Sequence, residues 1–446
     1  MSRVFYLSIV AALAGFIFGF DTVVISGADK KLQSLWGSSD FYHGAVVMAM
    51  ALWGTVLGAL GGSFPTNKFG RKNTLLLIGI LYTISALGSA LANSSEIFAF
   101  FRFIGGIGIG ISTIAAPAYI SEISPSSKRG SLVGLYQFNI VFGILIAFLS
   151  NYFLSNLGEN SWRWMMGVEF FPAIIYTVLV FNIPKSPRWL IQTGKIELAN
   201  KVLTEISPNE NIEVLIENIF NEKADNSENI FQLKYRFSIL LTFLIAAFNQ
   251  LSGINAFLYY APRIFEEAGL GESTALLSSV GIGLVNLIFT FIGISLIDKL
   301  GRKQLMYYGS FGYIISLSLV SISFFLKLNP ILIPIFLFVF IASHAIGQGT
   351  VIWVFISEIY PNHLRSSGQS FGSSVHWVLA AIIPSMIPIL FSSIGAGFVF
   401  SFFSFMMFLQ LIFVNYFMPE TKGVSLEELS KVLSKIVIKK TFRNED

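Results

Sequence analysis

The segment NKFGRK, residues 67–72, decides the organisation of this chain because it recurs in the second half as DKLGRK, residues 298–303. Two further motifs recur in the same order, each 235 or 236 residues after its first copy: YISEISPSSKRG (119–130) as FISEIYPNHLRS (355–366), and PKSPR (184–188) as PETKG (419–423). Three markers in the same order with nearly constant spacing indicate an internal duplication.

The composition around these motifs is that of a membrane protein. Of 446 residues, 54% are hydrophobic and only 12% are charged, whereas about 25% of residues are charged in a globular protein. About 20 apolar residues are needed to cross the hydrocarbon core as a helix. We predict twelve membrane-spanning helices, over residues 4–27, 43–64, 74–92, 97–119, 131–153, 164–183, 237–261, 274–297, 304–326, 332–356, 367–391 and 396–418.

The largest polar block, residues 184–236, carries seven basic and eight acidic residues and lies between two sets of six spans. We expect it to form short helices on the cytoplasmic face. The predicted fold is therefore all-α and integral to the membrane, with two six-helix bundles whose duplication relates them by an axis along the membrane normal. The expected divisions are 1–183, 184–236, 237–418 and a cytoplasmic tail, 419–446.

The basic residues settle the predicted orientation. With both termini cytoplasmic, the inner segments carry 23 of the 29 Lys and Arg residues, as the positive-inside rule requires. Arg102 lies within a span, and the outer loops hold Lys30, Lys31, Arg163, Arg263 and Lys327. The net charge of +4 thus reflects topology in a lipid bilayer, and we expect no nucleic-acid partner.

Several classes of chemistry are excluded. The chain has no cysteine, and its four histidines, at 43, 344, 363 and 376, show no spacing typical of a metal site. GGIGIG, residues 105–110, would need a preceding strand to bind a nucleotide; in the 97–119 span its glycines instead indicate close helix packing. We expect no enzymatic activity and no cofactor.

Three charged residues lie within spans of the first half: Asp21, Arg102 and Glu169. Each is five or six residues from the outer end of its span, or roughly 7–9 Å deep at 1.5 Å per residue. Intramembrane ionisable residues mark ion or proton pathways by default. Two carboxylates would compete for one guanidinium, so one can accept a proton, and Asp21 is the expected acceptor. A static Arg102 ion pair is the alternative, and Glu169 could be purely structural.

Polar side chains also interrupt the 237–261 span, within the stretch FNQLSGINAFLYYAP, residues 248–262. Asn249, Gln250 and Asn255 cannot all share one face of an ideal helix, but Gly253 can loosen the backbone between them. We therefore predict a broken helix whose amides face one cavity. An amide offers both donors and acceptors, which suits the hydroxyls of a sugar.

These motifs together resemble the sugar porter family of the major facilitator superfamily. The resemblance rests on GFDTVVISGA (19–28), the two Gly-Arg-Lys loops, the two Ser-Glu-Ile motifs, PKSPRWL, NQLSGINAFLYYAP and PETKG, and it runs from Phe20 to Gly423. It implies that two bundles rock around a central sugar site. It also implies proton coupling, because proton-coupled members resemble this chain in having Asp at the Asp21 position and Arg at the Arg102 position.

The resemblance places sugar contacts at Gln137, Gln250, Asn255, Asn286 and Trp353. We add Asn249, His376 and Trp377, and we expect Tyr259 and Tyr260 to form an outer gate. Each has a structural alternative: a lone amide can bond to a neighbouring helix, and aromatic residues can pack or lie at the interface. The chain departs from the family pattern at four positions that bear on the identity of the sugar: Asn249, Ile144, His376 and Thr350.

A cytoplasmic latch is also implied by the resemblance. Its members are Arg71, Glu122, Arg129, Arg302, Glu358, Arg365 and Glu420. Their guanidinium groups can cap helix C-termini or pair with the carboxylates, although the basic residues also serve the positive-inside rule. Asn67 and Lys185 stand where the family has acidic residues, which predicts a weaker latch in the first half.

The sequence therefore predicts a proton-coupled symporter of a hexose or pentose that works by alternating access and functions as a monomer. A proton-independent sugar uniporter is the main alternative. A sugar sensor that does not transport is a second, although only residues 419–446 are available as a signalling tail. The membrane is a bacterial inner membrane or a eukaryotic plasma membrane.

Overall fold

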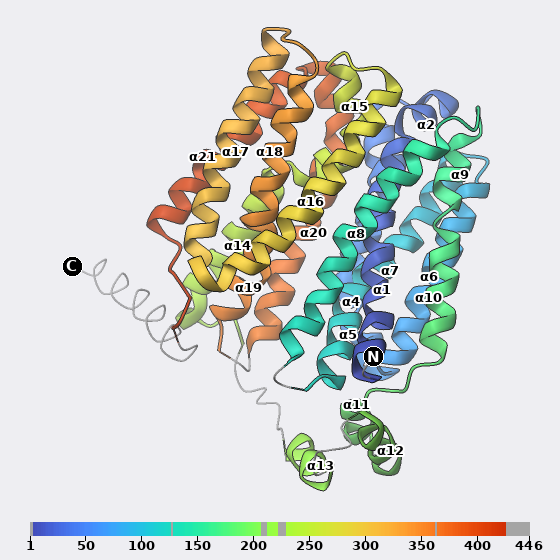
Figure 1. Cartoon of the computed structure of the whole chain (residues 1–446), viewed down its shortest axis with the longest axis vertical. Coiled ribbons are helices and arrows are strands. Elements are labelled where there is room, and N and C mark those ends of the chain that lie inside the picture. Colours follow the sequence, from blue (N-terminus) through green and yellow to red (C-terminus); the bar gives the residue numbers. More distant parts are fainter. Residues whose placement is uncertain (1–2, 126–127, 207–211, 222–228, 362–363, 425–446) are drawn as a thin grey trace. The chain divides into compact units, whose positions relative to one another are not determined.

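The computed structural model describes residues 3–125, 128–206, 212–221, 229–361 and 364–424, and within these ranges all regular structure is helical (Figure 1). The chain divides into two compact units, Met1–Lys223 and Ala224–Asp446. Each unit contains one copy of the duplicated motifs.

The first unit contains the helices of the first six spans and those that follow them. They are α1 (Arg3–Val24), η1 (Ile25–Gly27), α2 (Asp29–Trp36), α3 (Asp40–Tyr42), η2 (His43–Met48), α4 (Met50–Gly61), α5 (Ser63–Lys68), α6 (Arg71–Leu91), α7 (Ser95–Ile123), α8 (Arg129–Leu154), α9 (Ser161–Gly167), α10 (Phe170–Phe181), α11 (Pro187–Gln192), α12 (Ile196–Ile206) and α13 (Ile212–Asn221).

The second unit contains the remaining spans. They are η4 (Leu233–Tyr235), α14 (Arg236–Leu251), α15 (Ile254–Glu267), α16 (Glu272–Leu300), α17 (Arg302–Phe325), α18 (Leu332–Ile346), α19 (Gln348–Glu358), α20 (Arg365–Ser393) and α21 (Ala396–Tyr416).

The number of membrane-spanning helices agrees with the sequence prediction. Among the described residues, eleven helices are long and apolar enough to cross a membrane, and a bent pair, Asp40–Met48 with Met50–Gly61, supplies a twelfth. That pair bends by 41°, and its first member contains a π-helix, His43–Met48. The bend was not predicted, because the apolar pattern of the 43–64 span gives no sign of it.

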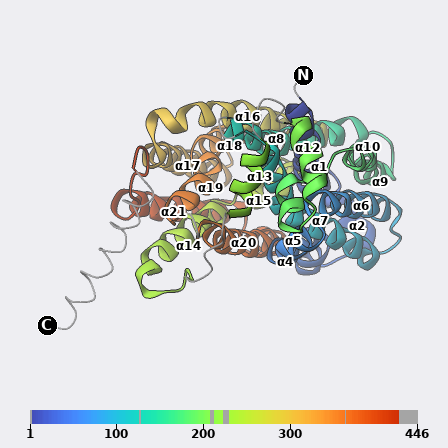
Figure 2. The ribbon, with the colours of Figure 1, turned by 90° about the horizontal axis from the view of Figure 1, so that it is seen from below.

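Short helices follow the sixth span, as predicted for the polar block. Figure 2 shows α12 and α13 at the face of the molecule that is seen from below. Ala199, Leu203 and Ile206 of α12 are buried against the first bundle, and Arg3 pairs with Glu205 at 2.7 Å. An apolar face and an ion pair thus hold α12 beside the start of α1.

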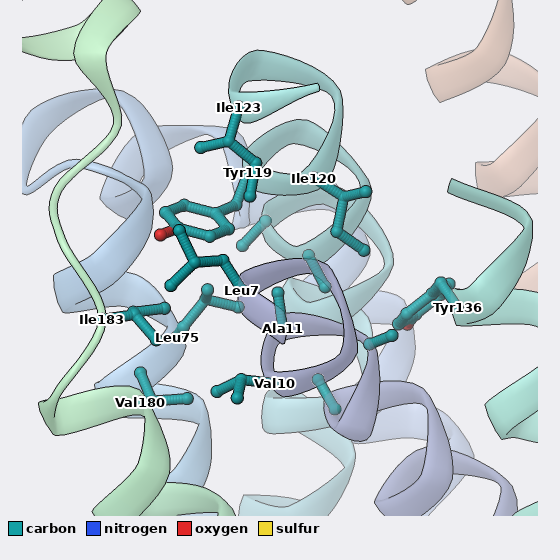
Figure 3. Packing of buried hydrophobic residues seen from close by; sticks show 14 of the residues in the cluster. Leu7, Val10, Ala11, Leu75, Tyr119, Ile120, Ile123, Tyr136, Val180 and Ile183 are labelled. Carbon is teal, nitrogen blue, oxygen red and sulfur yellow. The ribbon is translucent and has the colours of Figure 1, made fainter. Parts of the chain in front are cut away.

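Helix α1 lies in the centre of the first unit's core. Figure 3 shows Leu7, Val10 and Ala11 of α1 among buried side chains from α6, α7, α8 and α10, which include Leu75, Tyr119, Tyr136 and Val180. These side chains are at most 7% exposed. Burying α1 on several sides fixes the orientation of its one acidic residue, Asp21.

The glycines of GGIGIG permit α4 and α7 to touch backbone to backbone, as the sequence predicted. A methyl group on Gly106 would overlap the carbonyl oxygen of Ala51, and one on Gly110 would overlap that of Thr55. The contact is reciprocal, because a methyl group on Gly54 of α4 would overlap the carbonyl oxygen of Phe103 on α7. Close packing of small residues replaces the hydrophobic effect, which does not drive helices together in lipid.

We predict that Gly106→Ala destabilises the first unit by about 1–3 kcal/mol, because overpacking must separate two helix backbones. Thermal unfolding of the purified protein in detergent measures this change. Gly61→Ala, on α4 with open space around its Cβ, should leave the midpoint unchanged or slightly higher. Equal midpoints for the two variants would contradict tight α4–α7 packing.

Three spans are broken at the points where polar side chains gather. The predicted break in the 237–261 span is confirmed: α14 ends at Leu251, Gly253 has φ +83°, and α15 begins at Ile254. In the sixth span the helical hydrogen-bond ladder is interrupted before Phe170, although Val168 and Glu169 keep helical φ and ψ, and the tenth span breaks at Gly347. In the sixth span the cause is Pro172, whose ring cannot accept the helical position of the carbonyl four residues earlier, at Val168.

Candidate functional site

A buried charged cluster lies within the first unit. Arg102 of α7 donates from Nη1 to Oδ1 of Asp21 on α1, and from Nη2 to the backbone oxygen of Asp21 at 3.0 Å. Both side chains are about 1% exposed. The predicted meeting of Asp21 and Arg102 is thus present in the structure, and it joins α1 to α7.

Glu169 completes this cluster at the break between α9 and α10. It is 1% exposed, and it interacts electrostatically with both Asp21 and Arg102. Two ionised carboxylates cannot hydrogen-bond to each other, so the contact between Glu169 and Asp21 becomes a hydrogen bond only when one of them holds a proton. One guanidinium therefore faces two buried carboxyl groups. It can neutralise one of them, so ionising both costs free energy, and a proton on either carboxyl removes that cost.

A hydroxyl cluster that the sequence analysis missed lies deeper in the same unit. Tyr82 on α6 donates to Ser112 on α7 at 3.3 Å, and Ser112 is 2.9 Å from the hydroxyl of Tyr136 on α8. All three residues are buried. Isolated Tyr and Ser residues within apolar spans gave no pattern by which this cluster could have been predicted.

The predicted amides of the second unit meet at the break between α14 and α15. Asn255 donates to Oε1 of Gln250 at 2.9 Å, and Gln250 donates to Oδ1 of Asn249 at 2.9 Å. The left-handed conformation of Gly253 produces this arrangement, because it turns Asn255 back toward the end of α14. Asn249 and Gln250 are at most 3% exposed, whereas Asn255 is half-buried.

His376 lies beside this cluster, between two aromatic rings. Its ring centre is 5.2 Å from that of Trp353 and 4.9 Å from that of Trp377. Nε2 of Gln250 is 3.2 Å from each of the two ring nitrogens of His376, Nδ1 and Nε2. Because an amide N–H can only donate, the histidine must present an unprotonated nitrogen to it. Six of the eight predicted sugar contacts are therefore neighbours: Asn249, Gln250, Asn255, Trp353, His376 and Trp377.

Of the other predicted residues, Asn286, Tyr259 and Tyr260 belong to the second unit and Gln137 to the first. Asn286 on α16 is 7% exposed and accepts a hydrogen bond from Thr290 at 3.5 Å. Gln137 is half-buried on α8 of the first unit. Tyr259 and Tyr260 on α15 are buried, and Tyr260 donates to the carbonyl of Pro384 at 3.1 Å. That carbonyl lacks its helical donor because residue 388 is a proline, so Tyr260 satisfies an acceptor that α20 leaves free.

A small cavity beside the α14–α15 break is apolar and is not built from the predicted sugar contacts. Its lining consists of Ser252, Gly253, Ala256, Phe257, Ile264, Leu317, Phe340, Ile387, Phe391, Phe400 and Phe403. A sugar needs several polar partners, and this lining offers a single hydroxyl. We therefore place the candidate sugar site at the amides and His376.

The predicted latch residues form corresponding ion pairs in the two units. Arg71 at the start of α6 pairs with Glu122 near the end of α7 at 2.7 Å. Arg302 at the start of α17 pairs with Glu358 at the end of α19 at 2.6 Å. The glycine before each arginine has a positive φ, 83° at Gly70 and 96° at Gly301, which explains the Gly-Arg-Lys motif. Arg129 and Arg365 begin α8 and α20.

Glu420 caps the N-terminus of α17. Its carboxylate accepts hydrogen bonds from the backbone N–H groups of Arg302 at 2.9 Å and Lys303 at 3.0 Å, and from those of Thr421 and Lys422. Burial raises the pKa of the Glu420 carboxyl, but these four donors outweigh it and hold the pKa below its usual value. The cap ties the end of α21 to the start of α17.

We predict that this cap is lost in acid. A carboxyl with a depressed folded pKa contributes stability that is complete above its unfolded pKa of about 4.3 and disappears as the pH falls through the lower folded value. Glu420→Gln should therefore lower the melting temperature at pH 7 and make its decline below about pH 4.3 shallower. Glu267→Gln, at an exposed carboxylate, is the control; the same pH profile in parent and Glu420→Gln would refute the cap.

The first unit lacks the corresponding carboxylate because Lys185 stands in its place. A lysine has no acceptor, so it cannot cap α6, and it lies close enough to Lys72 in the first turn of α6 to repel it. Asn67 likewise replaces the acid that the second unit has as Asp298, which bonds to Arg302 at 3.0 Å. The two ends therefore differ in charge although their ion pairs correspond.

We predict that Lys185→Glu stabilises the first unit by about 1 kcal/mol, through removal of this repulsion and gain of a helix cap. A higher melting temperature in detergent would show it. Lys195→Glu is a matched control, because Lys185 and Lys195 both lie over the ring of Trp189, at 5.7 and 5.3 Å. An equal shift in both variants would count against capping.

Comparisons with known proteins agree with this architecture. The family model described as "Sugar (and other) transporter" matches residues 7–433. The arabinose-proton symporter of Bacillus subtilis (strain 168) is 34% identical over 443 residues, covering 97% of this chain and 95% of that protein. The D-xylose-proton symporter of Escherichia coli (strain K12) is 32% identical over 468 residues, covering 96% of this chain and 95% of that protein.

Solved structures give the same result. The xylose transporter XylE from E. coli, in an inward-open conformation, superimposes with a TM-score of 0.86 at 30% identity, covering 96% of this chain and 100% of that chain. The fold is that of the major facilitator superfamily, as predicted. This chain belongs to the sugar transporter family and is a multi-pass membrane protein, a transporter rather than an enzyme.

Proposed function

We propose that this protein is a proton-coupled symporter of a monosaccharide, a hexose or a pentose. The observation that carries the proposal is the charged cluster of the first unit, where one buried guanidinium faces two buried carboxyl groups. A passive sugar channel or uniporter has no need of this arrangement, which is costly in a bilayer. Relatives named as arabinose-proton and D-xylose-proton symporters support the same assignment.

The cluster suggests how a proton could change the structure. In the deprotonated state Asp21 holds Arg102, and Glu169 lies beside both of them, within reach of the Asp21 carboxyl. Protonation of Asp21 removes the charge that holds the guanidinium, and Glu169 can then receive it. Because Asp21 and Arg102 join α1 to α7, this exchange loosens the contact between two central helices of the first unit.

The sugar end of the proposal rests on neutral polar groups. Asn249, Gln250, Asn255 and His376 form a connected set, and the ring of Trp353 lies beside it. Amides can both donate to and accept from sugar hydroxyls, and an indole ring can pack on the apolar C–H face of a pyranose. Trp377, Asn286 and Gln137 are proposed as further contacts, with Tyr259 and Tyr260 as the gate.

The remaining features of the proposal concern topology and the cycle. We place both termini in the cytoplasm and the protein in the cell membrane as a functional monomer, with bundles 1–183 and 237–418 joined by 184–236. The ion pairs Arg71–Glu122 and Arg302–Glu358, with Glu420, Arg129 and Arg365, form the proposed cytoplasmic latch. Their position at helix ends fits a contact that is made and released during alternating access.

Uptake into proteoliposomes tests the assignment. Labelled D-xylose, L-arabinose and D-glucose are offered with and without an inward proton gradient. With one proton per sugar, a gradient of one pH unit permits accumulation of up to about tenfold. We predict accumulation by the parent and its loss in Asp21→Asn, which should still exchange internal for external sugar because the sugar site is intact.

The control is Asp29→Asn, which removes a buried carboxylate that is bonded to His43 at 2.7 Å in the same unit but outside the charged cluster. This variant should still accumulate sugar. Equilibration without accumulation in the parent, and the same behaviour in Asp21→Asn, would replace symport with facilitated diffusion. The ion pair between Asp21 and Arg102 would then be a permanent contact.

A further inference from the structure

Six polar side chains of the second unit form a continuous hydrogen-bonded chain through the bundle, which we call the amide chain. They are Asn255 on α15, Gln250 and Asn249 on α14, Gln348 on α19, Gln410 on α21 and Ser310 on α17. Gln348, Gln410 and Ser310 are fully buried. The proposed function makes no use of these last three residues.

This hydrogen-bonded chain of side chains ends at a group that can only accept a hydrogen bond from its neighbour in the chain. The hydroxyl of Ser310 donates its single hydrogen to the backbone carbonyl of Met306 at 2.7 Å. It can therefore only accept from Gln410, whose Nε2 is 2.8 Å away. This fixes the amide of Gln410 with its nitrogen toward Ser310 and its oxygen toward Gln348.

A second acceptor-only group fixes Gln348 in the same sense. Nε2 of Gln348 donates to Oε1 of Gln410 at 2.8 Å and to the backbone carbonyl of Ile245 at 3.4 Å. Both of its N–H groups are thereby used. Its oxygen is left to face Asn249, whose Nδ2 is 3.5 Å away in the longest link of the chain.

The same polarity continues to the sugar site. Asn249 has turned its nitrogen to Gln348, so its oxygen accepts from Gln250, and the oxygen of Gln250 in turn accepts from Asn255. Reversing one amide in the middle would set oxygen against oxygen and nitrogen against nitrogen. Each such contact loses a hydrogen bond where no water replaces it, so the orientations are coupled along the chain.

We propose that Gln348 and Gln410 are positioning residues that set the hydrogen-bonding character of the sugar site. One of the two N–H groups of Asn255 is committed to Gln250, and this orients the carbonyl oxygen of Asn255 away from Gln250, where it can accept from a donating hydroxyl of the sugar. The inference rests on the proposed function, since it takes the ligand at Asn255 to be a sugar.

Binding of sugar analogues to the full purified chain tests the polarity. D-Xylose and D-glucose are compared with their monodeoxy and monodeoxyfluoro derivatives, in the parent and in Asn255→Ala. One hydroxyl should contribute to affinity in the parent but not in Asn255→Ala. At that position fluorine cannot donate, so the fluoro sugar should bind as weakly as the deoxy sugar. A fluoro sugar that recovers most of the affinity, or no hydroxyl that depends on Asn255, would overturn the inference.

Gln348→Leu tests the positioning role, since leucine keeps the volume but releases Asn249, and Gln250 is then held only by His376, whose tautomer can adapt to either orientation of the amide. We expect the Kd to rise about fivefold, the order of one lost hydrogen bond. The fluoro sugar should now bind better than the deoxy sugar, because the Asn255 amide can reverse and present an N–H where its carbonyl oxygen stood. Gln410→Leu should show a smaller change in the same direction, because the bond from Gln348 to Ile245 remains.

Ser404→Ala is the matched control. Ser404 on α21 bonds to Ser318 on α17 at 2.8 Å, so its loss also removes a contact between those helices, but it is not a member of the chain. Its affinity and its ranking of the analogues should equal those of the parent. If Gln348→Leu has a lower melting temperature but ranks the sugar analogues as the parent does, the hydrogen-bonded chain of amides has only a structural role. Failure of every sugar to bind the parent would instead overturn the proposed function.

Discussion

The ion pair between Arg102 and Asp21 shows the constraint on which the rest of the structure depends: hydrocarbon offers no water to polar groups. Each buried charge or amide must find its partner within the protein, at a cost of several kcal/mol, by order of magnitude, if it does not. The pair joins α1 to α7 in the first unit, and the amide chain joins five helices in the second. Polar contacts that would be minor in a soluble protein therefore determine which helices lie together.

The same constraint explains why the helix breaks coincide with the candidate sites. A break exposes backbone groups, which are tolerated only where protein or a polar chamber satisfies them. Pro172 interrupts the hydrogen-bond ladder of the sixth span beside Glu169, and Gly253 breaks the seventh span beside Asn255. Tyr260 donates to the carbonyl that Pro388 leaves without a helical donor. The left-handed Gly253 brings Asn255 into a position that a continuous helix could not give it.

Duplication produced two halves with one architecture and different chemistry. The ion pairs of Arg71 and Arg302 correspond, and so do the turns at Gly70 and Gly301. The buried charged cluster, in contrast, belongs to the first unit, and the buried amide chain belongs to the second. A proton-driven sugar transporter can thus assign the ion to one bundle and most of the cargo contacts to the other, as the proposed function requires.

The sequence by itself determined the helical membrane fold, the number of spans, the duplication, the break at Gly253 and the family. These follow from local rules. The sequence shows directly how long the apolar segments are, where a glycine permits a left-handed conformation, and how the motifs are spaced. It also gave a common depth for Asp21, Arg102 and Glu169, because depth in a bilayer follows from position within a span.

Only the tertiary structure decided which partner each polar group takes. It placed Asp21 rather than Glu169 on Arg102, set His376 between Trp353 and Trp377, and revealed Gln348 and Gln410 as members of the amide chain. Single glutamines in apolar spans give no sequence pattern. Their partners lie on helices far apart along the chain, and packing of those helices, rather than any local preference, determines the distances between them.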